Sequence, residues 1–176
     1  MSRRITLALL VGALATGVGG CGDTTSGSPT TGSSTTASQT LFNPCTGISD
    51  EALRAAGVDP ATEEAGIAGV HQSGWEICNW DGPKYFISVF STGRTVAEFE
   101  RKPGNVDFQD VLVGGRPGRQ FRVEGASKYL DCDVLFPAAQ GVVQLKVLNR
   151  AGADDLEDPC AVLHRVGTSI VPALPR

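Results

Sequence analysis

The sequence has few of the side chains from which most active sites are built. It contains two histidines, His71 and His164, and one methionine, and only 6% of its residues are aromatic. A serine hydrolase triad needs a histidine between a nucleophile and an orienting carboxylate. The G-x-S-x-G turn that places the serine in many hydrolases is also absent. We therefore expect no catalytic group and interpret both histidines as residues of the surface or of a helix flank.

Nucleotide-binding loops are absent as well. The segment 114–119 is rich in glycine and arginine, but it lacks the Gly-Lys-Ser/Thr of a P-loop and the glycine spacing of a dinucleotide-binding turn. Turn formation alone accounts for its glycines and its proline. Because Arg116, Arg119 and Arg122 concentrate positive charge, we also consider them as an anion-binding site for a polyanionic wall polymer.

Positive charge is otherwise scarce. The chain carries 15 basic and 19 acidic side chains, a net charge of -4 at pH 7. Such a protein has little electrostatic attraction for nucleic acids, so no nucleic-acid partner is expected. Asp131, Asp133 and the acidic segment 154–158 are candidate calcium ligands, but they lack EF-hand spacing and Asp158 is explained as a helix cap. We expect no cofactor and no metal.

No apolar stretch is long enough to cross a membrane as a helix. The most apolar one, residues 5–18, is shorter than the roughly 20 residues that a spanning helix needs. It follows Arg3 and Arg4 and ends just before a small-residue segment, which is the order of an export signal. Val18, Gly20 and Cys21 resemble the bacterial lipobox, in which the cysteine is fatty-acylated and becomes the N-terminus. An ordinary secretory signal with an incidental Cys21 is the alternative.

The chain divides into three parts by composition. Residues 1–20 are predicted to be the lipoprotein signal peptide. Residues 21–40 are dominated by serine and threonine, with almost no charge and no large apolar side chain. Such a segment cannot bury enough surface to fold, so it is predicted to be a flexible tether, and it is a candidate for O-glycosylation. Residues 41–176 are predicted to form a single domain.

Four cysteines follow Cys21, and none of them forms a C-x-x-C pair. An exported protein meets an oxidising compartment, so two disulfides are favoured over a zinc site. Spacing alone leaves the connectivity open. Cys45 and Cys160 each follow an Asx-Pro pair that begins a helix, whereas Cys78 and Cys132 lie within strand patterns. We therefore favour Cys45 with Cys78 and Cys132 with Cys160.

Periodicity predicts an α+β fold. An antiparallel sheet of about six strands is expected, with the N-terminal and C-terminal helices packed on one side and two disulfides. Capping residues and apolar stripes predict helices near residues 50–56, 95–102 and 158–171. Alternating or β-branched runs predict strands at 75–80, 85–90, 108–113, 119–124, 130–136 and 142–148.

Four short motifs together resemble an actinobacterial cell-envelope lipoprotein family of unknown function. They are Asn43-Pro44-Cys45, Cys78-Asn79-Trp80, Cys132-Asp133-Val134, and Asp158-Pro159-Cys160 in a terminal helix that is followed by Leu174-Pro175. The resemblance covers residues 41–176. It implies a surface-exposed envelope lipoprotein and brings no catalytic residues with it.

These features predict a lipid-anchored binding or interaction module on the extracytoplasmic face of the cell membrane. Its expected contacts are the membrane, through the anchor, and an envelope protein or a wall polymer. The alternative is a carrier for a small molecule or lipid, in which the sheet and the last helix part to hold an apolar ligand. An envelope hydrolase is the least favoured interpretation.

Overall fold

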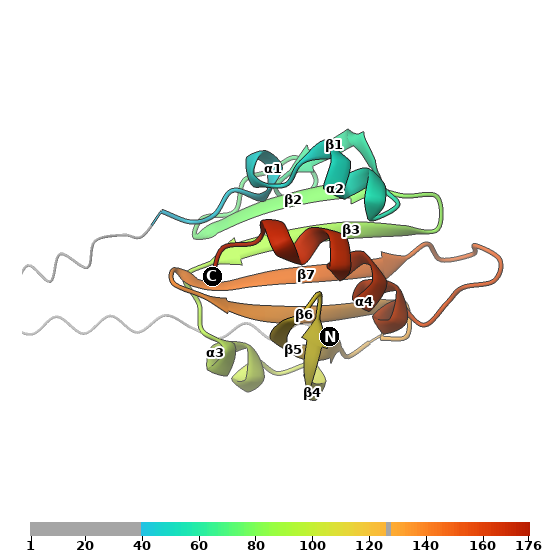
Figure 1. Ribbon diagram of the computed structural model, residues 1–176. Helices are drawn as coiled ribbons and strands as arrows, with labels where there is room; N and C mark the ends of the chain where they lie inside the picture. Colours follow the sequence, from blue (N-terminus) through green and yellow to red (C-terminus); the bar gives the residue numbers. More distant parts are fainter. Residues whose placement is uncertain (1–39, 126–127) are drawn as a thin grey trace, which may run out of the picture. The chain divides into compact units, whose positions relative to one another are not determined.

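The computed structural model describes residues 40–125 and 128–176 (Figure 1). The predicted signal peptide, Cys21 and the predicted tether up to residue 39 lie outside the described residues. Contacts divide the chain into two units, 1–36 and 37–176, and every helix and strand of the described part belongs to the second. No helix among the described residues is long and apolar enough to cross a membrane.

A seven-stranded antiparallel sheet forms the centre of this unit. Its strands are β1 (Asp59–Ala65), β2 (Trp75–Asp81), β3 (Tyr85–Thr92), β4 (Asn105–Val113), β5 (Arg116–Val123), β6 (Asp131–Ala138) and β7 (Gly141–Asn149). They lie in the order β1-β2-β3-β7-β6-β5-β4. The last strand, β7, therefore lies at the centre, between β3 and β6.

The helices begin where the sequence predicts caps. They are α1 (Pro44–Gly47), α2 (Asp50–Ala55), α3 (Val96–Arg101) and α4 (Pro159–Ile170), and a 3-10 turn, η1 (Val171–Ala173), follows α4. The Asn43 side chain accepts a hydrogen bond from the Cys45 amide, and Asp158 accepts one from the Cys160 amide. The predicted capping box of Thr95 and Glu98 opens α3. These bonds satisfy amide donors that the first turn of a helix leaves free.

Three helices cover one face of the sheet. Helix α4 lies across β7 and β6, α2 packs against α4 and β1, and α1 lies over β2 (Figure 1). Because side chains alternate along a strand, Val143, Leu145 and Val147 of β7 all point into this layer. The same core contains Trp80 and Leu163, which are fully buried. We call this side of the sheet the α4 face.

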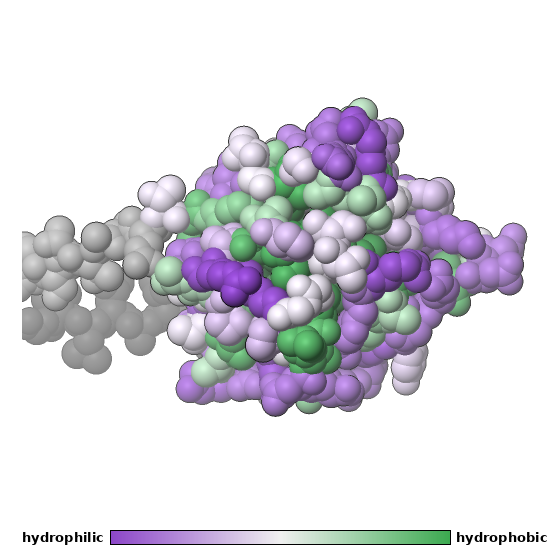
Figure 2. Space-filling model, viewed as in Figure 1, coloured by the Kyte–Doolittle hydropathy of each residue, from purple (hydrophilic) through white to green (hydrophobic). Residues whose placement is uncertain are grey.

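Helix α3 packs against the opposite side, which we call the α3 face. There Phe99 of α3 belongs to a smaller buried cluster with Phe121, Leu135 and Val142. The outer surface on the α4 side is mostly polar, with a compact apolar patch over β4 (Figure 2). That strand is an edge strand and carries Leu112, which is 65% exposed.

The prediction of about six strands missed β1. Six of the seven strands match predicted ones, and the N-terminal and C-terminal helices share one face of the sheet as expected. Strand β1 has the sequence DPATEEA, and all but one of its residues are exposed. It pairs with β2 through an irregular register between Asp59 and Glu64. Because neither of its faces is buried, β1 has no apolar alternation that could have revealed it.

Both favoured disulfides are confirmed. Cys45 is bonded to Cys78 and ties α1 to β2, with 5.3 Å between the Cα atoms. Cys132 is bonded to Cys160 and ties α4 to β6, with 5.1 Å between the Cα atoms. Each bridge therefore fixes the first turn of a helix to a strand beneath it.

Removing either bridge should lower stability by a similar amount. The bridges close 33 and 28 residues, and each should stabilise the fold by about 3 to 4 kcal/mol by restricting the unfolded chain. We expect Cys132→Ala with Cys160→Ala, and separately Cys45→Ala with Cys78→Ala, to reduce the free energy of unfolding in urea by about this amount. Unchanged unfolding curves for either pair would contradict the structural role.

Candidate functional site

The three arginines considered for anion binding lie on both sides of the sheet. Arg116 and Arg122 point to the α4 face, whereas Arg119 points to the α3 face and reaches Glu100 of α3. The separations of three residues from Arg116 to Arg119 and from Arg119 to Arg122 produce this split, because strand side chains alternate. The structure does not bring the three guanidinium groups together.

Each of these arginines is also engaged within the chain. Arg116 is buried and donates to the carbonyl oxygens of Pro137 and Leu174 at 2.6 and 3.4 Å. Arg119 forms ion pairs with Glu100 and Asp110 at 2.8 and 3.0 Å. Arg122 pairs with Asp158 at 2.8 Å and also donates to two carbonyl oxygens. Arg116, Arg119 and Arg122 therefore do not form a shared anion-binding site in this structure.

The histidines and the candidate calcium ligands are likewise dispersed. The His164 ring lies 2.8 Å from Gln120 of β5, whereas His71 is exposed in the loop before β2. Asp158 caps α4, whereas Asp131 and Asp133 lie on the α3 face of β6 beside Lys146. The acidic residues therefore do not converge on one point.

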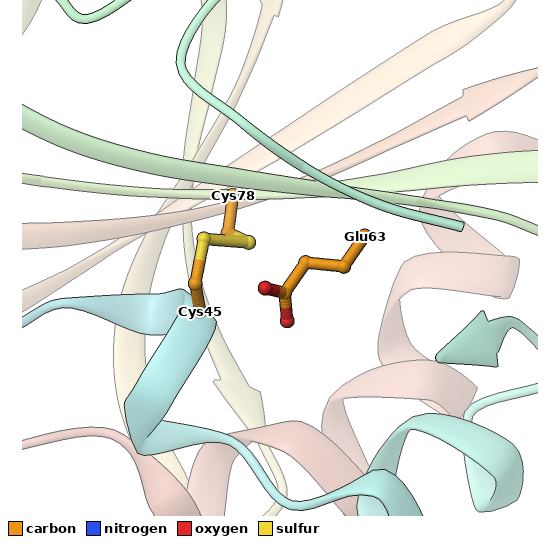
Figure 3. Close-up of side chains that lie close together, drawn as sticks. All are labelled: Cys45, Glu63 and Cys78. Atoms are coloured by element: carbon orange, nitrogen blue, oxygen red, sulfur yellow. A yellow bond between two sulfur atoms is a disulfide. The ribbon is translucent and has the colours of Figure 1, made fainter. Parts of the chain in front are cut away.

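One group of potential metal ligands lies close together among the described residues. It consists of the two sulfur atoms of Cys45 and Cys78 and the carboxylate of Glu63, all within 4.8 Å of one another (Figure 3). The sulfur atoms are bonded to each other, whereas zinc takes thiolates. The group is therefore a disulfide beside an exposed carboxylate.

A hollow with a volume of about 380 Å³ lies on the α3 face, and several aromatic side chains line it. Strands β2, β3, β4, β5 and β7, helix α3 and the loop before β2 contribute to it. Its apolar walls are Ile67, Trp75, Ile77, Phe90, Phe99, Phe121 and Val123, and its polar lining is Gln72, Ser73, Lys102, Asn105 and Gln144. We call it the aromatic cavity.

Strand alternation and one helix bring the aromatic rings together. Trp75 and Ile77 share one face of β2, and Ile77 is paired with Phe90 of β3. The Trp75 ring is edge-on to Phe90 and to Phe99, with centroid distances of 6.3 and 6.1 Å. Phe99 is in turn edge-on to Phe121 at 6.2 Å. Such contacts fix ring orientation, so the wall is held in place without a ligand.

Gln144, which forms the floor of the aromatic cavity, is hydrogen-bonded to a group of charged side chains beneath it. Gln144 lines the cavity and donates a hydrogen bond of 2.6 Å to Asp133. Behind it, the Lys146 ammonium lies 2.8 Å from an Asp131 oxygen and 3.5 Å from an Asp133 oxygen. Asp133 is fully buried and Asp131 is 2% exposed. These bonds hold the Gln144 amide in one orientation at the cavity floor.

Burial and the neighbouring charges shift the pKa values of Asp133 and Lys146. It raises the pKa of Asp133 to about 6, although the Lys146 ammonium and the Gln144 amide oppose the rise. Burial also disfavours the charged form of Lys146, but the Asp133 and Asp131 carboxylates outweigh it and raise the pKa of Lys146. The ammonium therefore stays charged at neutral pH.

Two exposed basic side chains, Lys102 and Arg94, lie beside the cavity, and we call this side of it the mouth. Lys102 follows α3 and lines both the aromatic cavity and a smaller adjoining hollow of about 200 Å³. Arg94 lines the smaller hollow, and its guanidinium lies 5.9 Å from the centre of the Trp75 ring. Among residues 40–125 and 128–176, neither Lys102 nor Arg94 forms an ion pair.

This site was not predicted from the sequence. Alternation along β2 places Trp75 and Ile77 on the face away from Cys78. The sequence did not show that Phe99 and Phe121, which are distant from Trp75 along the chain, complete the aromatic wall of the cavity. The arrangement of an apolar wall with a few oriented polar groups is typical of a site for a small ligand.

The raised pKa of Asp133 predicts a pH-dependent stability. The folded state holds this proton more tightly than the unfolded chain, so the contribution is present below about pH 4 and is lost as the pH rises toward 6. We expect the free energy of unfolding of the natural protein, relative to Asp133→Asn, to fall by about 2 kcal/mol between pH 4 and pH 7. Urea unfolding of both proteins at the two pH values measures this. A difference that does not change with pH would contradict it.

Comparison with known proteins yields one match. Residues 16–173 match the model of a family described as "Protein of unknown function (DUF3558)". No curated protein and no solved structure shows significant similarity to the chain. The match extends over nearly all of the sequence, including Cys21 and the four bridged cysteines. The chain therefore belongs to the DUF3558 family of proteins of unknown function.

Proposed function

We propose that this protein is a lipid-anchored binding module of the cell envelope that holds a small amphipathic molecule in the aromatic cavity. The observation that carries the proposal is the cavity itself, whose volume of about 380 Å³ falls within the range of roughly 300 to 1,000 Å³ of small-molecule sites. Its aromatic rings offer a large apolar contact area, and its oriented amides offer hydrogen bonds.

This proposal develops the carrier alternative of the sequence analysis but moves its site. The carrier was expected to hold its ligand between the sheet and the last helix. That space is filled, because Leu163 and Ile170 of α4 are fully buried against the sheet. The aromatic cavity lies on the opposite face, which α3 covers only in part. A ligand can therefore bind there without separating α4 from the sheet.

An interaction with a wall polymer has less support. It depended on Arg116, Arg119 and Arg122, which are used in contacts within the chain. The proposed binding partner is therefore a small molecule in the aromatic cavity.

The membrane anchor is the second part of the proposal. An apolar segment that ends in Gly20-Cys21 supports lipidation of Cys21, as in the actinobacterial lipoproteins that the cysteine motifs resemble. The family match begins at residue 16, so the similarity includes this junction. The two disulfides agree with an oxidising, extracytoplasmic location.

Replacing the proposed lipid attachment site should release the protein from the membrane. We expect Cys21→Ala to move the protein from the membrane fraction to the soluble or secreted fraction, because one thioether-linked lipid is its proposed anchor. Fractionation of cells expressing the natural protein or the variant measures this. A variant with both Cys132→Ala and Cys160→Ala, which retains Cys21, controls for altered folding. Membrane retention of Cys21→Ala would contradict the anchor.

Filling the aromatic cavity should remove a bound molecule. Native mass spectrometry of protein purified from its own cell should show an added small-molecule mass that is lost on denaturation. Ser73 is an exposed residue of the cavity lining, so Ser73→Trp should fill the cavity and abolish the added mass. Ala151→Trp, in the exposed turn after β7, is the matched control and should retain it.

Two results would contradict the binding proposal. One is a natural protein that carries no added mass and gains none when incubated with the hydrophobic probe N-phenyl-1-naphthylamine. The other is an added mass that Ser73→Trp retains in full while its thermal unfolding matches that of Ala151→Trp.

A further inference from the structure

We infer that the molecule bound in the aromatic cavity is an amphipathic anion, whose negative group is held by Lys102 with Arg94 beside it. The inference rests on the proposed function of the cavity and specifies its ligand class. The apolar part of the ligand lies against Trp75, Phe99 and Phe121, and its single acidic group lies at the mouth.

The lining of the aromatic cavity carries positive charge, which favours an anionic ligand. Among the described residues that line the cavity, Lys102 is the one charged side chain, and the lining contains no carboxylate. The chain as a whole is acidic, with a net charge of -4. A positive, carboxylate-free lining in an acidic protein attracts an anion to this site rather than to the remaining surface.

The position of Lys102 is the second argument. Its amide donates to the Phe99 carbonyl oxygen at 3.2 Å, and its own carbonyl oxygen accepts from the Asn105 amide at 3.2 Å. The Asn105 side chain also donates to the Phe99 carbonyl oxygen at 2.9 Å. The backbone at Lys102 is therefore fixed beside the aromatic wall, while the ammonium group forms no ion pair within residues 40–125 and 128–176.

Arg94 adds a second positive group, and the nearby acid does not neutralise the pair. Glu98 lines the smaller hollow with Lys102 and Arg94. Its carboxylate, however, accepts hydrogen bonds from the Thr95 amide and hydroxyl at 2.7 and 2.8 Å. These bonds lower the pKa of Glu98 and hold its charge at the start of α3. The mouth therefore has an excess of one positive charge.

A cationic ligand is the opposite possibility, because aromatic rings also attract cations. The Arg94 guanidinium already lies over the Trp75 ring. The nearest buried carboxylate, Asp133, is screened from the cavity by the Gln144 amide and is paired with Lys146. A ligand cation would therefore meet two positive side chains, and the acid that lines the smaller hollow, Glu98, is already hydrogen-bonded to Thr95.

A pair of matched probes tests this inference. N-phenyl-1-naphthylamine and 1-anilinonaphthalene-8-sulfonate share one ring system, and only the second carries a sulfonate. Titrations at low salt should show tighter binding of the anionic probe to the natural protein. Lys102→Gln should weaken the anionic probe about three- to fivefold, as expected for the loss of a solvent-accessible ion pair, and leave the neutral probe unchanged.

Three further variants make this result specific. Lys102→Arg retains the charge and should restore binding of the anionic probe. Lys84→Gln removes an exposed lysine in the turn between β2 and β3, away from the cavity, and should change neither probe. Ser73→Trp should abolish binding of both probes, because both occupy the same cavity.

The outcomes separate the inference from the proposed function. If both probes bind equally, or if Lys102→Gln weakens both alike, the cavity binds small molecules but the anion inference is wrong. If neither probe binds, or if Ser73→Trp binds both as well as before, the proposed function itself fails.

Natural ligand chemistry can be tested by competition. Dodecanoate should displace the neutral probe from the natural protein more effectively than dodecanol does, and Lys102→Gln should remove this preference. Supplying the acid in phosphatidylcholine vesicles instead of in solution identifies its source. Displacement by the vesicles assigns a membrane source, and displacement by the dissolved acid alone assigns a soluble one. Displacement by dodecanol as effective as by dodecanoate would overturn the inference.

Discussion

The Cys132–Cys160 disulfide ties α4 to β6, and the close contact of Gly167 with Val113 holds α4 against the edge strand β4. A side chain at position 167 would collide with Val113, so glycine allows the helix to approach the strands closely. Helix α4 lies across β7 and β6 and, together with α1 and α2, covers one face of the sheet. Of the helices in the described part of the chain, only the short α3 packs against the other face. One face of the sheet is therefore covered by helices, whereas the other is covered only in part, because α4 packs on the first.

The incompletely covered face carries both the apolar and the charged features of the molecule. Phe99 from α3 is part of the aromatic wall, and Gln144 connects the cavity to the buried Asp133 and the half-buried Lys146. Buried charges are costly unless they are paired and hydrogen-bonded, and here both carboxylates lie beside one ammonium. The same network orients the polar group that a ligand would meet at the cavity floor. A rigid wall and an oriented floor reduce the ordering cost of binding.

Much of the local structure could be predicted because its causes are local. Asn43 and Asp158 cap helices through bonds to amides two residues away, and the Thr95–Glu98 capping box spans three residues. The favoured disulfide pairing was confirmed because both bridges connect a helix start with a strand interior. Strand β1 was missed because an exposed strand leaves no alternation in the sequence.

The sequence by itself determined the helix starts, six strands and the alternation that separates Trp75 from Cys78, since each depends on residues close together in the chain. It favoured one pairing of the four cysteines, and the tertiary structure decided that pairing. Only the tertiary structure decided which strands are neighbours, and therefore which distant side chains meet. It gave Arg116 and Arg119 separate partners within the chain, and it brought Phe99 and Phe121 to Trp75 around one cavity. The physical reason is that sheet order and helix packing depend on the burial of the whole apolar surface, which no single segment of the chain specifies.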